Sequence, residues 1–103
     1  MGKVIINAAL TGNIHVPSMS PYLPLTPDQL TNEAVRCEKA GAAVVHVHAR
    51  NPEDGKPSTE LELYREILSS IKSKTKLVVS PTTGGTATMT PEERIRVVRE
   101  LKP

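Results

Sequence analysis

Apolar residues form three short continuous runs along the chain, and between the runs apolar positions recur every three or four residues. The runs lie within residues 3–8, 42–50 and 76–80. Continuous aliphatic runs of this length are typical of strands buried on both faces, whereas the spaced positions are typical of amphipathic helices. The pattern therefore predicts the order βαβαβα, which implies an α/β fold with parallel strands and right-handed crossovers.

The predicted helices carry start signals. Thr26 followed by Pro27 predicts an N-cap and a first helical residue, with a capping box completed three residues after the cap, and Thr90 opens the third helix in the same way. Ser58 or Thr59 is expected to cap the second helix. The expected buried stripes are Leu30, Ala34 and Cys37 before a C-cap at Gly41, then Leu61, Tyr64, Leu68 and Ile71, and finally Ile95, Val98 and Leu101.

A polar motif closes or follows each run. Thr11 follows the first run, His46 and His48 close the second, and residues 82–85 follow the third. The carboxyl ends of parallel strands share one edge of a sheet, so all three motifs are expected on one rim, where α/β folds bind ligands. The long loop over residues 9–25 is either part of a binding site or a cover without chemistry.

His46 and His48 are two residues apart in a predicted strand, so their imidazoles point to the same face. Two imidazoles so placed can reach one zinc ion, which makes them candidate metal ligands. The alternative is a pair of histidines with satisfied hydrogen bonds at a strand end. A catalytic zinc needs a third protein ligand. Its candidates are His15, Glu53, Asp54 and Glu60. None is well placed, so we expect the third ligand outside these residues.

The turn Thr82-Thr83-Gly84-Gly85 offers hydroxyls and backbone N–H groups that can approach a carboxylate or phosphate closely, because glycine tolerates positive φ. Threonine and glycine are also ordinary turn residues. Arg50, which follows the histidine pair, either binds an acid group or is a solvated loop cation. We predict a substrate site from these residues together with Thr11.

Composition narrows the possible binding partners and the cell compartment of the protein. The chain has 103 residues, a net charge of +2 with both signs mixed along it, and one cysteine. No charge run favours nucleic acid or a membrane surface, and no apolar run approaches the roughly 18 residues of a membrane span. A single cysteine permits no internal disulfide, which suits the cytoplasm. With neither Phe nor Trp, the core must come from small aliphatic side chains, which is marginal at this length.

Three segments occur in a specific combination: residues 7–12 (NAALTG), 40–50 (AGAAVVHVHAR) and 82–85 (TTGG). Together they resemble the β-keto acid cleavage enzyme family. The resemblance covers essentially the whole chain but only the N-terminal part of the family's chain. It implies that residues 1–103 are the first three βα units of a (β/α)8 TIM barrel, an incomplete part of one catalytic domain.

The resemblance also implies a site and a reaction. It implies Zn2+ bound by His46 and His48 with a glutamate from a later strand, and a turn at residues 82–85 that holds the keto-acid end of the substrate. The implied reaction is a retro-Claisen type acyl transfer, in which a β-keto acid and acetyl-CoA give acetoacetate and a new acyl-CoA. The catalytic residues are expected beyond Pro103, so the 103-residue chain alone is expected to be inactive, and the full-length form a homo-oligomer.

Two positions depart from the family pattern. Ile14 stands where many relatives have an acidic residue that binds a substrate amino group, which points to a less polar β-keto acid. Asn51 stands where many relatives have Asp. Two other functions stay open at this point: a different metal-dependent TIM-barrel hydrolase, and a non-catalytic anion-binding fragment.

Overall fold

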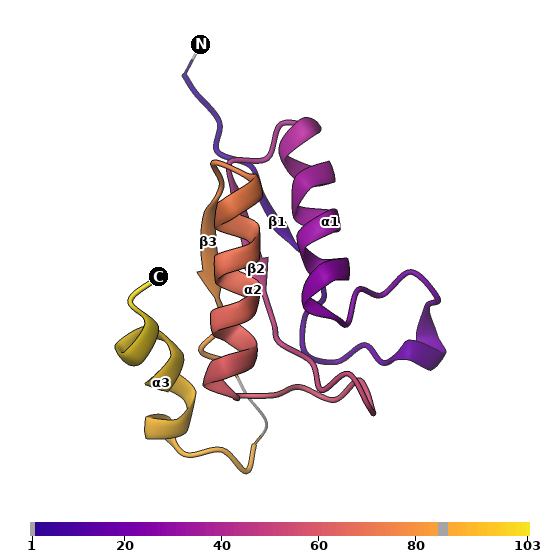
Figure 1. The fold of residues 1–103 in the computed structure, drawn as a ribbon, viewed down its shortest axis with the longest axis vertical. Coiled ribbons are helices and arrows are strands. Elements are labelled where there is room, and N and C mark those ends of the chain that lie inside the picture. Colours follow the sequence, from indigo (N-terminus) through magenta and orange to yellow (C-terminus); the bar gives the residue numbers. More distant parts are fainter. Residues whose placement is uncertain (1, 85–86) are drawn as a thin grey trace.

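The computed structural model describes residues 2–84 and 87–103, in which three strands alternate with three α-helices (Figure 1). In chain order the elements are β1 (Asn7–Ala9), a short 3-10 helix η1 (Pro17–Met19), α1 (Pro27–Lys39), β2 (Val44–Val47), α2 (Leu61–Lys74), β3 (Val78–Pro81) and α3 (Pro91–Leu101). The strands pair in parallel in the spatial order β1-β2-β3. The predicted element order and the parallel sheet are confirmed.

Two of the three predicted helix starts are confirmed. The Thr26 hydroxyl accepts a hydrogen bond from Gln29 N at 3.1 Å, and the Gln29 side chain accepts one from Thr26 N at 3.2 Å. The same reciprocal capping box forms at Thr90 at the start of α3. The predicted cap of α2 is wrong, because its N-cap is Glu60. The Ser58 hydroxyl instead accepts from the Glu60 N–H in a local turn.

The first strand and the third helix also differ from the predicted pattern. Only Asn7–Ala9 pairs with β2, so β1 begins later than residue 3, and the side chains of Val4 and Ile5 are exposed. In α3 the buried residue is Val97, whereas the predicted stripe residues Ile95 and Val98 are 48% and 42% exposed. Periodicity recognised both apolar segments, but which residues find a partner depends on tertiary packing.

Helices cover one face of the sheet and leave the other face open. α1 and α2 lie side by side against the covered face (Figure 1). Val45 and Val79 point to this face and are 0% and 4% exposed, whereas their neighbour Val78 points the other way and is 62% exposed. Strand register places Ala9, His46 and Ser80 opposite one another in a single row. By strand alternation, this row lies on the open face.

The core lies between the covered face and the two helices. Leu30 from α1 and Ile67 and Ile71 from α2 are fully buried against the strands. The buried Tyr64 hydroxyl accepts a hydrogen bond from the Ala49 N–H at 3.1 Å, which links α2 to the segment just after β2. This bond holds the segment just after β2, which also contains His48. Among the described residues, none of the helices combines the length and the apolar character of a membrane span.

Adjacent valines in α3 provide a matched test of the observed packing. Val97→Ala is expected to lower the free energy of unfolding by about 1–3 kcal/mol, because two buried methyl groups are lost and a cavity remains. Val98→Ala is expected to change it by less than about 0.5 kcal/mol, since Val98 is 42% exposed. Urea denaturation of both variants measures the difference. A larger loss of unfolding free energy in Val98→Ala than in Val97→Ala would contradict the observed orientation of α3, in which Val97 is buried.

Candidate metal and substrate site

The two histidines lie together at the carboxyl end of β2. His46 is in the strand and His48 follows it by two residues, so both rings project from the open face. Their ring centroids are 4.9 Å apart, with an angle of 81° between the planes. The edge-to-face arrangement brings two imidazoles within reach of one ion.

Each ring is held through its Nδ1 atom. His46 Nδ1 lies 3.1 Å from the Ser80 hydroxyl on β3, and His48 Nδ1 lies 2.8 Å from Asn13 Oδ1 in the loop after β1. Within residues 2–84 and 87–103, these are the hydrogen bonds that the two rings make. Nε2 of each ring makes none of these bonds, so it can bind a metal ion when the ring proton is on Nδ1. Two imidazole donors suit zinc.

Burial keeps His48 neutral. Its side chain is 9% exposed, and burial lowers its pKa from 6.5 to about 4, with electrostatic interactions with His46 and the Arg50 guanidinium acting in the same direction. A metal ligand must be the neutral imidazole. His48 therefore keeps the ligating form well below neutral pH.

A third ligand does not join the pair within the described residues, where no group of three His, Cys, Asp or Glu side chains could hold an ion. His15 is exposed and contributes its backbone carbonyl to Arg50. Asp54 accepts a hydrogen bond from Lys56 N in the turn after β2. Of the candidates weighed from sequence, none reaches the two imidazoles.

The threonines of the site flank His48. Thr82 follows β3, is 8% exposed, and donates its backbone N–H to Val47 O at 2.9 Å. Its hydroxyl accepts from the Gly84 N–H at 2.8 Å. On the other side, the buried Thr11 hydroxyl lies 3.5 Å from His48 O. The ends of all three strands thus bring polar groups to one rim.

The remaining turn residues make other contacts. Thr83 is exposed, and its carbonyl accepts a hydrogen bond from Arg94 Nε at 2.9 Å. A Cβ atom added to Gly84 would lie 3.0 Å from Thr82 Oγ1, so glycine allows the tight turn here. Gly85, the fourth predicted turn residue, lies outside the described residues.

Arg50 is fully buried and is not a solvated loop cation. Nη1 donates to Gly55 O at 2.9 Å and to His15 O at 2.5 Å, and Nη2 donates to Gly12 O. The guanidinium therefore ties the loop after β1 to the loop after β2. Its direct contact with a substrate acid group stays a prediction.

Sequence reasoning missed Asn13 and Ser80, the partners of the two histidines. Ser80 is two residues after Val78 in the same strand, and strand alternation alone puts it on the open face. Its position opposite His46 follows only from the register. Asn13 carries no signal in the sequence, because its place depends on how a long loop folds.

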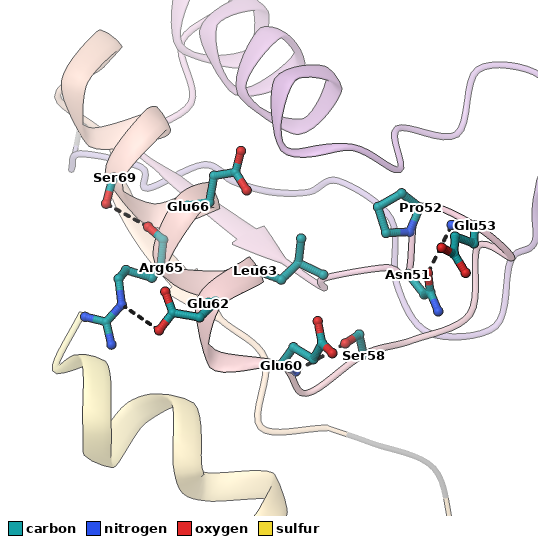
Figure 2. Close-up of a pocket in the computed structure, with 10 residues that line it drawn as sticks. All are labelled: Asn51, Pro52, Glu53, Ser58, Glu60, Glu62, Leu63, Arg65, Glu66 and Ser69. Atoms are coloured by element: carbon teal, nitrogen blue, oxygen red, sulfur yellow. Dashed lines mark hydrogen bonds and ion pairs between the residues drawn. The ribbon is translucent and has the colours of Figure 1, made fainter.

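A separate groove lies between α2 and the loop that precedes it (Figure 2). It has a volume of about 830 Å³ and is lined only by residues between 51 and 69. Figure 2 shows the side chains of Glu62 and Arg65 pointing toward one another, and their atoms Oε1 and Nε are 3.4 Å apart. Neither histidine lines this groove, so it is distinct from the site at the histidine pair.

Comparison with known proteins gives a consistent picture. Residues 3–103 match the profile of a family described as beta-keto acid cleavage enzyme. The chain is 46% identical over 101 residues to 3,5-dioxohexanoate:acetyl-CoA acetone transferase of Paraburkholderia graminis, covering 98% of this chain and 33% of that protein. It is 36% identical over 104 residues to 3-keto-5-aminohexanoate cleavage enzyme of Fusobacterium nucleatum, covering 100% and 38% of the two chains. The chain therefore spans about a third of the length of these curated relatives.

A solved structure shares the fold. The ternary complex of ObcA with a C4-CoA adduct and oxalate aligns with a TM-score of 0.56 and 31% sequence identity. The alignment covers 62% of this chain and 17% of that chain. The aligned part of this chain thus corresponds to a small part of that larger structure.

The burial of His48 generates a pH prediction. Between pH 6.5 and about 4, the unfolded chain binds a proton that folded His48 does not, so the free energy of unfolding falls as the pH falls. The effect is absent above pH 6.5 and reaches at most about 3 kcal/mol. Urea denaturation across this range should show a smaller loss for His48→Gln than for the unchanged chain. An equal pH dependence of the free energy of unfolding in His48→Gln and the unchanged chain would contradict the lowered pKa of His48.

Proposed function

The chain belongs to the β-keto acid cleavage enzyme family, and we propose that it supplies the zinc-binding strand and the substrate turn of an enzyme that acts on a β-keto acid and acetyl-CoA. The products are acetoacetate and a new acyl-CoA. The observation that carries the proposal is the pair His46 and His48, whose Nε2 atoms are available on the same rim as Thr82. The names of two curated relatives describe transferases that act with acetyl-CoA.

We also propose that the three βα units are the first part of a (β/α)8 barrel. β1 and β3 each pair with one neighbour within the described residues, and the face that carries His46 is open. In a barrel this face lines the interior, and side chains from neighbouring strands stack there in layers. The row Ala9, His46 and Ser80 is compatible with such a layer.

In the proposed reaction, the residues of this chain bind and orient the substrate. Zinc bound by the two histidines would supply a Lewis acid for the keto oxygen. The Thr82 hydroxyl accepts from the Gly84 N–H and still has its own hydrogen to donate to the carboxylate. A fixed donor of this kind stabilises negative charge without reorganising. Thr11 flanks the opposite side of His48, and Arg50 holds the loops and adds positive charge to the rim.

The first test uses a chimera in which residues 1–103 replace the matching third of the Paraburkholderia graminis relative. His46→Ala and His48→Ala are expected to abolish bound zinc and acetyl-CoA-dependent acetoacetate formation, because each removes one of two ligands on this strand. His15→Ala is the matched control, since this side chain is exposed and the substitution keeps the backbone carbonyl that Arg50 contacts. Metal analysis and product assay measure the effects.

The outcomes separate the competing functions. Unchanged zinc content in both histidine variants would overturn the ligand assignment. Metal-dependent hydrolysis without any requirement for acetyl-CoA would indicate a hydrolase instead. Carboxylate binding with neither bound metal nor turnover would indicate a non-catalytic anion-binding module.

Ile14 is proposed to select the substrate. Its side chain is 80% exposed, one residue after Asn13, which contacts His48. An apolar residue here favours a β-keto acid without an amino group. In the chimera, Ile14→Glu is expected to shift the kcat/KM ratio toward amino-bearing β-keto acids by about 10-fold, through a charge interaction of roughly 1.4 kcal/mol. Ile14→Gln controls for size, and a shift as large in this variant would exclude charge as the cause.

A further inference from the structure

Asn13 makes a contact that none of the predicted site residues makes. Its Oδ1 atom lies 2.8 Å from Nδ1 of His48, although the two residues are 35 positions apart in the chain. The ring of His48 is 9% exposed, so water has little access to compete for this bond. The Asn13 amide therefore determines whether Nε2 of His48 carries a proton or a free lone pair.

The backbone on either side of Asn13 is fixed by a buried charge. Arg50 donates to the carbonyls of Gly12 and His15, and it is itself 0% exposed. Gly12 adopts a φ of 68°, a left-handed conformation that glycine takes without strain. Asn13 is thus held between two anchored carbonyls, which limits its movement away from His48.

An asparagine amide can accept or donate, and the choice decides the histidine tautomer. When Oδ1 accepts, His48 carries its proton on Nδ1, and Nε2 keeps a lone pair for a metal. When the amide nitrogen donates, the proton must be on Nε2, which then cannot bind a metal. Ser80 gives His46 no such constraint, because a hydroxyl can both donate and accept.

In the structure, the Asn13 amide takes the accepting orientation. With Oδ1 toward His48, the amide nitrogen faces the turn after β3, where a Cβ atom added to Gly84 would lie 3.5 Å from it. The amide donors are then directed toward the segment proposed to hold a carboxylate. One amide group can serve the histidine with its oxygen and the turn side with its nitrogen.

We propose that Asn13 is a positioning residue that holds His48 in the Nδ1–H tautomer and so presents Nε2 to the metal ion. This inference rests on the proposed zinc function. It adds a residue from the loop after β1 to a site whose ligands come from β2, and the tautomer it requires can be observed in metal-free protein.

The experiment records long-range proton–nitrogen correlation spectra of the metal-free chain with nitrogen-15 histidine. The expected result is a proton on Nδ1 of His48. In Asn13→Ala the population should move toward the Nε2–H form, which neutral histidine prefers in water, and Asn13→Asp should restore the Nδ1–H form because it keeps an acceptor oxygen. Asn32→Ala, at an exposed asparagine of α1, is the matched control.

A second measurement uses zinc affinity in the chimera. Asn13→Ala is expected to weaken Zn2+ binding about 10- to 100-fold, with recovery in Asn13→Asp. A proton on Nε2 in the unchanged chain, or a tautomer unaffected by Asn13→Ala, would overturn the inference while leaving zinc binding by His46 and His48 intact. If the proposed zinc-binding function itself were wrong, the zinc content of His46→Ala and His48→Ala would be unchanged.

Discussion

The pairing of β2 with a strand on each side determines where the side chains of the candidate site lie. Register fixes His46 opposite Ala9 and Ser80, and the strand period of two then directs His48 to the same face. A slip of one residue would turn both imidazoles into the core and expose Val45 and Val47. The fully buried valines therefore stabilise the orientation of the histidines as well as the fold.

Arg50 resolves a problem that this arrangement creates. The loops after β1 and β2 cross closely, since a Cβ atom added to Gly55 would lie 2.7 Å from the Pro17 ring. Close loops leave backbone carbonyls that need donors. The guanidinium supplies donors to carbonyls of both loops, and charge-assisted bonds offset part of the cost of burying it. A lysine has no planar fork and could not satisfy the same three acceptors in this geometry.

Local chemistry made much of the fold predictable. The threonine caps at 26 and 90 depend only on residues within one helical turn, so sequence located them correctly. The α3 stripe depends on how the helix meets its neighbours, and the buried position proved to be Val97. The histidine pair was visible because strand spacing is local. The contacts of Asn13 with His48 and of the His15 carbonyl with Arg50 were not, because chain segments 35 positions apart meet only after folding.

The candidate site divides its tasks among the three βα units. β2 carries the imidazoles, the loop after β1 carries the amide that contacts His48, and the turn after β3 carries the hydroxyl and N–H groups. Each contribution reaches the others only because β2 lies between β1 and β3. A fragment of the first two units would lack the turn at Thr82, and a fragment of the last two would lack the contact from Asn13. Three consecutive units are thus the smallest part of the fold that brings all three kinds of group to one rim.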